Sequence, residues 1–358
     1  MPANLYQCKL PFRTPLHTGA GTIDTRTVWV LEIIDSAGRR GLGEAAPLPM
    51  FGGEMPKDCD EALHQAVAML DTEMVGGWLE RAKPDAALGA LEPLLARTPC
   101  ARHAIEGALL DLLAQTEKVP LAGLIAAHYA TLLPVNGLID THVDAPVVGK
   151  QMWLDGFGTI KLKCGLDSVH EATRVLALRA AVGDKAQIRV DANGQWSYDQ
   201  ALAFIEATRA ANLEYCEQPL APSEIQELAL LRRRSGLRIA VDESVRFPVD
   251  VGRIGAAQAA DVVVLKPMFL GGWRPLKQAV QLAHSCGMEV VITTALDSCI
   301  GRAFATHYAA AFGLTQRAQG LSTGALFVGD LTDAPLGVST GHTRLHERPG
   351  LGIGNLVG

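Results

Sequence analysis

Lys161 and Lys163 stand two residues apart in a short run that alternates basic and apolar residues. Residues two apart on a β-strand point to the same side, so the two ammonium groups would project together while Ile160 and Leu162 face the other way. Two ammonium groups at close range repel each other. The pattern therefore predicts an anionic centre beside this strand.

Four further apolar runs end in residues that could build such a centre. Three of them finish in a carboxylate, at Asp191, Glu217 and Asp242, and the fourth finishes in Lys266. Together with Lys163, these positions recur every 24 to 28 residues. That spacing is the length of one strand, one helix and two short loops. The repeat predicts consecutive β/α units that carry the five side chains at equivalent strand ends.

Three carboxylates that converge without a cation repel one another strongly, so the spacing predicts a metal ion held by Asp191, Glu217 and Asp242. Oxygen ligands with room for water suit Mg²⁺, and Mn²⁺ also fits. Lys163 and Lys266 would flank this ion from either side. The ion and the neighbouring Lys161 would disfavour the ammonium form of Lys163, as a general base requires.

Single residues of this set also have ordinary interpretations. Taken alone, Asp191 followed by Ala192-Asn193-Gly194 would form a turn, and a lone barrel lysine would be a solvated charge. A Schiff-base lyase that used Lys163 or Lys266 would leave the three carboxylates without a role. A non-catalytic binding protein would have no need of two opposed lysines. Five matching positions in five consecutive units favour a metal-assisted enzyme.

Composition limits the remaining possibilities. The 358 residues, 48% of them hydrophobic, can bury a large core, and no apolar run approaches the length of a membrane span. The net charge of −6 without a basic block argues against a nucleic-acid partner. Seven scattered cysteines and no signal peptide predict a reduced, cytoplasmic protein. The expected partner is a small carboxylate, and a homo-oligomer is compatible with the sequence.

Residues 1–125 are predicted to form an α+β capping domain, with a three-stranded meander over residues 5–46 and helices over 57–75 and 98–116. Loops near residues 14–26 and 47–54 interrupt this pattern. The first contains Gly19 and Gly21, and the second contains Met50 and Phe51. We expect both loops to close over the site and to contact the substrate.

Residues 126–325 are predicted to form a (β/α)₈ barrel, an α/β fold with its chemistry at the carboxyl ends of the strands. The expected strands lie near residues 134–139, 158–164, 187–191, 213–217, 238–242, 261–266, 289–294 and 320–326, and helices include 168–182, 197–211 and 272–286. A helix N-terminus at Ser298, with Arg302, is expected to meet an anionic group of the substrate. Residues 326–358 are expected to pack back on the cap.

At the level of motifs, the whole chain resembles the muconate-lactonising branch of the enolase superfamily. The resemblance rests on Lys161-x-Lys163, Asp191 with Asn193, Glu217-Gln218-Pro219, Asp242-Glu243-Ser244 and Lys266-Pro267. It implies a modified TIM barrel with an N-terminal cap, and Mg²⁺ on the three carboxylates holding a substrate carboxylate. It also implies that Lys163 and Lys266 lie on opposite faces of the substrate. Lys161, Asn193 and Glu243 would support them.

Residues 47–52, 293–302 and 320–324 look most like the o-succinylbenzoate synthases of menaquinone biosynthesis. That resemblance implies a lyase in which Lys163 removes the proton α to a carboxylate, an enediolate forms and water leaves. Lys266 would then act as a cation over the ring face. N-succinylamino-acid racemases and muconate cycloisomerases share the metal site and lysines, so they remain alternatives. Dipeptide epimerases usually carry an Asp-x-Asp pair on the eighth strand, which residues 320–326 lack.

Overall fold

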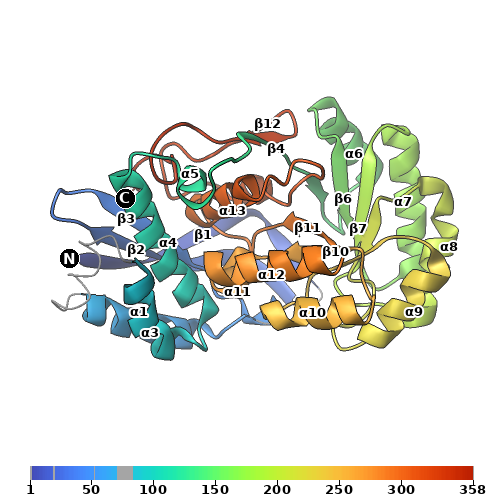
Figure 1. Cartoon of the computed structure of the whole chain (residues 1–358). Helices are drawn as coiled ribbons and strands as arrows, with labels where there is room; N and C mark the ends of the chain where they lie inside the picture. Colours follow the sequence, from blue (N-terminus) through green and yellow to red (C-terminus); the bar gives the residue numbers. More distant parts are fainter. Residues whose placement is uncertain (1, 19–20, 52, 71–83, 358) are drawn as a thin grey trace.

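The computed structural model describes residues 2–18, 21–51, 53–70 and 84–357. An antiparallel N-terminal sheet with its helices forms one part of the molecule (left in Figure 1). A parallel sheet wrapped by helices forms the other part, and α6 to α10 cover its outer side (Figure 1). The pocket described below lies where the two parts meet, because residues of both line it.

The N-terminal sheet is a meander of β1 (Ala3–Thr18), β2 (Gly21–Ile34) and β3 (Arg40–Ala45), as predicted. The prediction of a loop over residues 14–26 is wrong, because the described residues of this range extend β1 and β2 as a hairpin. A register shift after Pro11 lets Leu16 pair with Ile23 and become buried. The β-branched residues of this stretch favour such pairing. Gly19 lies outside the described residues.

Four helices in the described part of the chain belong to the cap. They are α1 (Pro56–Leu70), α3 (Pro84–Leu95), α4 (Pro99–Thr116) and α5 (Leu121–Ile125), and a 3₁₀ turn, η1 (Pro49–Phe51), follows β3. Of these helices, α1 and α4 pack on this sheet and the other two pack on helices. α4 lies directly against β3. A Cβ atom on Gly43 would stand 1.8 Å from the carbonyl oxygen of Ala104, and one on Gly41 would stand 2.2 Å from that of Ala108. Only glycine at these two positions allows so close an approach.

The larger sheet is parallel and runs in chain order from β5 to β11. Its strands are β5 (Gly137–Ile139), β6 (Thr159–Lys163), β7 (Gln187–Asp191), β8 (Tyr215–Glu217), β9 (Ile239–Val241), β10 (Val262–Leu265) and β11 (Glu289–Ile292). Between and after them lie α6 (Ala145–Leu154), α7 (Ser168–Val182), α8 (Tyr198–Ala207), η2 (Arg209–Ala211), α9 (Ile225–Ser235), α10 (Pro248–Ala256), α11 (Pro267–Leu270), α12 (Trp273–Ser285) and α13 (Cys299–Ala311). This is the predicted β/α alternation.

The eighth strand differs from the prediction. Residues 323–326, placed in a strand, form the 3₁₀ helix η3 (Thr323–Leu326). At the eighth position of the barrel, the described residues form the bridges of Gln319 to Val135 and of Gly320 to Thr293 in place of a strand, and the Gln319 side chain also accepts from the backbone N–H of Ile292. These two bridges join the segment to both edges of the seven-stranded sheet, beside β11 and before β5. The segment therefore closes a modified barrel without a regular eighth strand.

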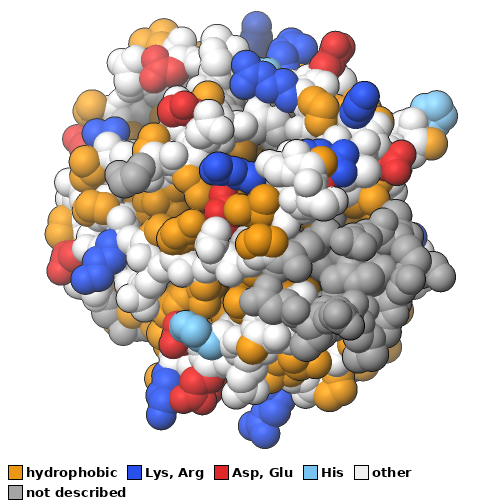
Figure 2. Space-filling model, turned by 90° about the vertical axis from the view of Figure 1, so that its left-hand side faces the viewer, with side chains coloured by type: hydrophobic (Ala, Val, Ile, Leu, Met, Phe, Trp, Pro, Cys, Tyr) orange, Lys and Arg blue, Asp and Glu red, His pale blue; other side chains and the backbone are white. Residues whose placement is uncertain are grey.

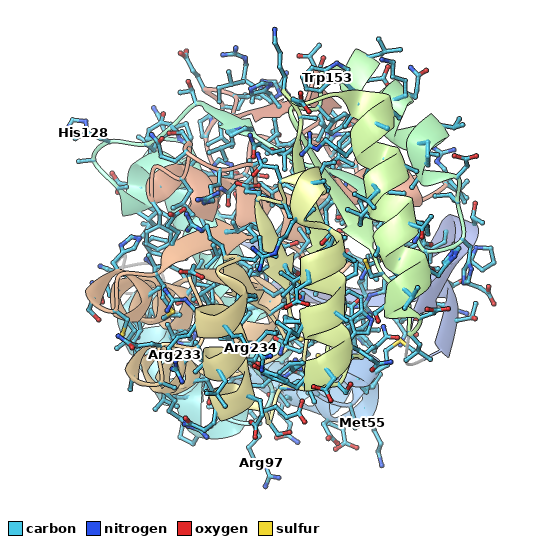
Figure 3. The ribbon with its side chains drawn as sticks, turned by 90° about the vertical axis from the view of Figure 1, so that its right-hand side faces the viewer. Met55, Arg97, His128, Trp153, Arg233 and Arg234 are labelled. Carbon is cyan, nitrogen blue, oxygen red and sulfur yellow. The ribbon has the colours of Figure 1, made fainter. Side chains whose placement is uncertain are left out.

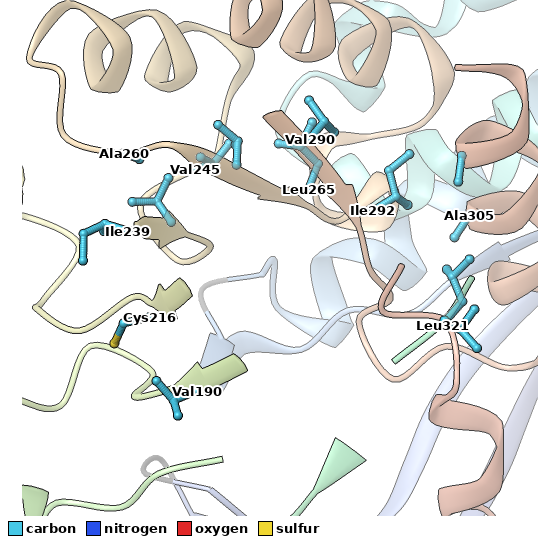
Figure 4. Close-up of a cluster of buried hydrophobic side chains, with 14 of the residues drawn as sticks. Val190, Cys216, Ile239, Val245, Ala260, Leu265, Val290, Ile292, Ala305 and Leu321 are labelled. Carbon is cyan, nitrogen blue, oxygen red and sulfur yellow. The ribbon is translucent and has the colours of Figure 1, made fainter. Parts of the chain in front are cut away.

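Alternation along the strands sends successive side chains to opposite faces of the sheet. Val190, Cys216, Ile239, Leu265 and Ile292 face the layer between the strands and the helices, where they form one buried cluster (Figure 4). The intervening positions face the barrel interior, where β6, β7 and β8 carry the charged residues of the site and β9 to β11 carry Ala240, Val264 and Val291. The strand sequences thus fix which side chains reach the interior.

The C-terminal residues contact the cap and extend a second small sheet. The ring of Phe327 lies 4.7 Å from that of Phe12, centre to centre, and the backbone N–H of Leu351 donates to Asp111 at 2.8 Å. In the sequence between Phe327 and Leu351 lie β12 (Val338–Ser339) and β13 (His342–Arg344). β13 pairs with both β12 and β4 (Leu132–Pro134) to form a three-stranded sheet.

The surface carries charges of both signs. On the face at the left of Figure 1, hydrophobic side chains gather toward the middle, and acidic and basic ones are scattered among them and around the edge (Figure 2). On the opposite face, Arg233 and Arg234 lie in the last turn of α9 (Figure 3), where cations favour the helix dipole. Among the described residues, the helices are too short or too polar to cross a membrane.

Candidate active site

The strand register brings the predicted site residues together. Lys163 pairs with Asp191 across β6 and β7, and Asp191 pairs with Glu217 across β7 and β8. Glu217 in turn pairs with Ala240, two residues before Asp242. Neighbouring strands stand about 4.8 Å apart. The side chains at these strand ends therefore share one sector of the barrel mouth, as the spacing predicted.

Each lysine contacts a carboxylate. The Nζ atom of Lys161 lies 2.6 Å from Glu217 Oε1 and 2.9 Å from Asp191 Oδ2, and that of Lys163 lies 3.4 Å from Asp191 Oδ2. Lys266 forms an ion pair with Asp242 on the other side of the sector. All three lysine side chains are about 15% exposed or less, so their ammonium groups are held within the pocket.

The surroundings shift the pKa values of these groups in opposite directions. Burial alone would raise the pKa of Asp191, but the ammonium groups of Lys161 and Lys163 hold it well below its usual range. Burial and the charges of Asp191 and Asp242 raise the pKa of Glu217 to about 7, against the attraction of Lys161. Burial would lower the pKa of Lys266, but Asp242 raises it above its usual value. The carboxylates of the site therefore have too few ammonium groups to neutralise all of them, and the raised pKa of Glu217 reflects this.

The donor set fits a divalent cation. Asp191, Glu217 and Asp242 are buried, offer only oxygen ligands and lie on consecutive strands. In the described part of the chain, no three His, Cys, Asp or Glu side chains are already arranged around a common point as metal ligands. Lys161 and Lys266 instead serve as their counter-ions. These two ammonium groups would have to withdraw for Mg²⁺ to bind to all three carboxylates.

Asn193 and Glu243, predicted as supporting residues, join one chain of hydrogen bonds. Lys163 Nζ donates to Asn193 Oδ1 at 2.8 Å, and Asn193 Nδ2 donates to Glu243 Oε1 at 3.0 Å. The backbone N–H of Asn193 donates to Asp191 Oδ1 at 3.0 Å. Glu243 Oε2 is buried without a hydrogen-bond partner. Asn193 thereby fixes the position of Lys163, and Glu243 keeps one oxygen free to accept a further bond.

The sequence interpretation assigned no role to Gln218. Its side chain is fully buried, and its Oε1 atom accepts the backbone N–H groups of Asp242 at 3.0 Å and Ser244 at 3.2 Å. Its Nε2 atom donates to the carbonyl oxygen of Leu220 at 2.9 Å. This amide therefore joins the ends of β8 and β9 and positions Asp242. Its signal in the sequence was its place in the Glu217-Gln218-Pro219 motif.

Gln218→Ala should lower the free energy of unfolding by about 3 kcal/mol, because three buried backbone groups would lose their partner. Chemical denaturation measures this loss. The control is Gln226→Ala on the exposed face of α9, which should change stability by less than about 0.5 kcal/mol. Equal stabilities of the two variants would contradict the role of the Gln218 amide.

The remaining wall of the pocket is apolar or carries hydroxyl groups. Phe51 lines it, as predicted, together with Leu48 and Leu16 of the cap. The barrel contributes Asn136, Leu138, Tyr215, Val264, Phe269, Val291, Thr293, Thr294, Ala295, Leu296, Gly320, Ser322 and Thr323. Met50 packs on the core of the cap instead, and Gly21 begins β2.

The prediction for Ser298 and Arg302 is wrong, because the chain's own carboxylates occupy that helix N-terminus. Glu44 of β3 accepts the backbone N–H groups of Ser298 at 2.9 Å and Gly301 at 2.7 Å, as well as the Ser298 hydroxyl. Arg302 is buried and forms an ion pair with Asp330. Both residues therefore serve the structure, with the Ser298 N–H and hydroxyl on Glu44 and the Arg302 guanidinium on Asp330 and the Asp297 carbonyl.

Comparison with known proteins agrees with this geometry. Residues 148–354 match the family described as "Enolase C-terminal domain-like", and residues 3–126 match the "Mandelate racemase / muconate lactonizing enzyme, N-terminal domain". The chain is 37% identical to an o-succinylbenzoate synthase of Thermobifida fusca over 59% of this chain and 68% of that one. It is 28% identical to an L-Ala-D/L-Glu epimerase of Bacillus subtilis over 84% and 82% of the two chains.

A solved structure shows the same fold throughout. The crystal structure of a dipeptide epimerase from Enterococcus faecalis, complexed with Mg and the dipeptide L-Leu-L-Tyr, superposes with a TM-score of 0.90. The superposition covers 99% of both chains at 24% sequence identity. The fold, both family matches and the strand-end residues agree, and the chain therefore belongs to the enolase superfamily, in the mandelate racemase and muconate lactonizing enzyme family.

Proposed function

We propose that the protein is an o-succinylbenzoate synthase-like lyase, which dehydrates a cyclohexadiene carboxylate to an aromatic acid in menaquinone biosynthesis. The observation that carries this proposal is the arc of Lys163, three carboxylates and Lys266 around one pocket. Such an arc can hold a substrate carboxylate between two ammonium groups. The likeness to o-succinylbenzoate synthases supports the choice of substrate.

Lys163 is the proposed base. Its Nζ atom would take the proton from the carbon α to the carboxylate, after Asn193 and Asp191 have oriented it. The C–O bond to the β-carbon then breaks, the hydroxyl group leaves as water with the proton that Lys163 has taken, and the ring becomes aromatic. Lys266, on the opposite side, would hold the negative charge that develops on the substrate. Its Nζ atom stands 6.0 Å from the centre of the Phe269 ring.

The three carboxylates would hold Mg²⁺. When bound, this ion supplies positive charge beside the substrate carboxylate, which makes the α-proton more acidic. Asp191, Glu217 and Asp242 would bind it in place of the ammonium groups of Lys161 and Lys266, which pair with these carboxylates in the structure. Loss of water from the pocket would strengthen all of these interactions.

The composition of the far wall favours this substrate over a dipeptide. Among the described lining residues, the acidic side chains are Asp191, Glu217, Asp242 and Glu243, all on the side of the metal-binding sector. The segment at the eighth strand position contributes Gly320, Ser322 and Thr323. A dipeptide would bring an ammonium group to a wall with no carboxylate to pair with it.

Racemisation of an N-succinylamino acid is the second candidate. The observation that favours it is that Lys163 and Lys266 both line the pocket, since a racemase needs a base on each face of the α-carbon. Both substrates carry a carboxylate with an α-proton and a succinyl group. The same site could serve either reaction.

Assays of the purified protein with Mg²⁺ in D₂O separate these reactions. The proposal predicts that the cyclohexadiene carboxylate is converted to an aromatic product, seen as a rise in absorbance, and that L-Ala-L-Glu is not epimerised. Racemase activity would appear as deuterium incorporation into N-succinyl-L-amino acids by NMR. Exchange without any aromatic product would replace the lyase with the racemase, and epimerisation of the dipeptide would contradict both.

A further inference from the structure

Leu296, in the connection between β11 and α13, lines the pocket with a left-handed backbone conformation, φ 60°. A residue with a Cβ atom adopts this conformation at a cost in stability. Asn193 and Gln218, at the ends of β7 and β8, share it, but their amides form hydrogen bonds that fix the chain there. Leucine has no polar group that could do so. Other residues must therefore hold Leu296 in place.

Arg26 of β2 fixes Ala295, the residue before Leu296. Its guanidinium is 3% exposed and donates from Nη2 to the carbonyl oxygen of Ala295 at 3.3 Å. The backbone N–H of Ala295 donates to Asp297 Oδ1 at 3.0 Å. Asp297 is itself buried, and its charge lies near Arg26. Both polar groups of the Ala295 backbone are thus occupied by buried charged residues, directly beside Leu296.

Glu44 of β3 fixes the residues that follow Leu296. Its carboxylate is fully buried and accepts the backbone N–H groups of Ser298 and Gly301, at 2.9 and 2.7 Å. The carbonyl oxygen of Asp297 accepts from Arg302 at 2.9 Å. The connection is therefore fixed by hydrogen bonds on both sides of Leu296. Arg26 and Glu44, which form hydrogen bonds with the residues on either side, both belong to the cap.

Arg26 also joins this wall to the cap side of the pocket. Its Nη1 atom donates to the carbonyl oxygen of Pro47 at 2.7 Å, and its Nη2 atom donates to that of Ala46. The next residue, Leu48, lines the pocket. Leu296 also packs against the core cluster of the cap. One guanidinium therefore sets the distance between the two apolar walls on either side of the substrate.

We propose that Arg26 and Glu44 are positioning residues that hold Leu296 in its left-handed conformation, and that Leu296 determines specificity by contacting the apolar part of the substrate. The identity of that substrate rests on the proposed function, whereas the positioning does not. The proposal makes separate predictions for stability and for kinetics.

The first experiment compares the melting temperatures of Leu296→Ala and Leu296→Gly. At a position with ordinary backbone angles the glycine variant is less stable than the alanine variant, because glycine gives the unfolded chain more conformational freedom. At Leu296 the glycine variant should melt at the same temperature as the alanine variant or higher, since glycine removes the backbone strain. The matched control is Leu138 of β5, which lines the same pocket without a positive φ. Leu138→Gly should melt below Leu138→Ala.

The second experiment measures kinetics and metal binding of Arg26→Met. We expect KM for the cyclohexadiene carboxylate to rise about tenfold, the effect of losing a hydrogen bond from a charged donor, with a smaller change in kcat. Mg²⁺ affinity should stay at the wild-type value, because Arg26 lies outside the carboxylate cluster. Arg26→Lys, which keeps a charged donor, should restore part of the loss.

The outcomes are distinguishable. If Leu296→Gly melts below Leu296→Ala by the margin seen at Leu138, or if Arg26→Met leaves KM unchanged, the positioning role is wrong. If wild-type protein converts neither substrate class, the proposed function fails, and the Leu296 and Leu138 pairs still decide the positioning role. Those pairs also decide it if Arg26→Met does not fold.

Discussion

Glu217→Gln should abolish turnover and Mg²⁺ binding while it leaves the melting temperature within a few degrees of the wild type. The substitution removes the central one of the three proposed ligands, and a metal contribution of several kcal/mol corresponds to a rate loss of about 10³-fold or more. Stability should change little, because burial and the neighbouring carboxylates raise the pKa of Glu217 to about 7. Burial thus works against the ionised form of Glu217, and a neutral glutamine of the same shape should cost little stability.

Calorimetric titration with Mg²⁺ measures the binding, and the rise in aromatic absorbance measures turnover. The control is Glu227→Gln on the exposed surface of α9, which removes the same charge away from the site. Asp191→Asn and Asp242→Asn should also lose Mg²⁺ binding. Asp191→Asn should lose more stability than Glu217→Gln, because Lys161 and Lys163 stabilise the ionised form of Asp191. Wild-type activity of Glu217→Gln in chelated buffer would show that the carboxylates do not hold a catalytic ion.

Lys163→Ala should lower kcat by about 10² to 10⁴-fold, the contribution of a general base, with Mg²⁺ affinity retained. Lys163→Arg should be equally inactive, because a guanidinium stays protonated at working pH and cannot accept the α-proton. The arginine variant keeps the positive charge beside Asp191 and so separates proton transfer from electrostatics. Steady-state kinetics measure the loss, and Lys185→Ala, exposed before β7, is the control.

Lys266→Ala then reports on the type of reaction. In a lyase it removes only the cation opposite Lys163, so some turnover should remain. In a racemase it removes one of two bases, and deuterium exchange should continue for one enantiomer only. Near-native turnover of Lys163→Arg, by contrast, would refute the assignment of Lys163 as the base.

The positions of the catalytic residues could be predicted because they depend on short-range regularities. The two-residue period of a strand fixed the direction of Lys161 and Lys163, and the β/α repeat fixed the strand ends of Asp191, Glu217 and Asp242. The parallel register converts this spacing in sequence into neighbouring positions in space. The barrel and the meander of the cap follow from the same regularities.

The parts that the sequence did not reveal depend on contacts between distant residues. Ser298 was predicted to bind a substrate anion, but Glu44, 254 residues earlier in the chain, occupies its N–H group. The prediction of a loop over residues 14–26 gave weight to its glycines, whereas pairing with the neighbouring strand decided its conformation. The roles of Gln218 and Leu296 depend on the neighbouring strand end and on the cap, and no local pattern encodes them.

The most direct test of the proposed chemistry is a single titration. Metal-free wild-type protein and Lys163→Ala are mixed with the cyclohexadiene carboxylate, and aromatic absorbance is followed as Mg²⁺ is added. We predict no product without metal, turnover that rises and saturates with Mg²⁺ in the wild type, and no turnover of Lys163→Ala at any Mg²⁺ concentration. Product formation by the chelated wild type, or Mg²⁺-dependent product formation by Lys163→Ala at the wild-type rate, would contradict metal-assisted proton removal by Lys163.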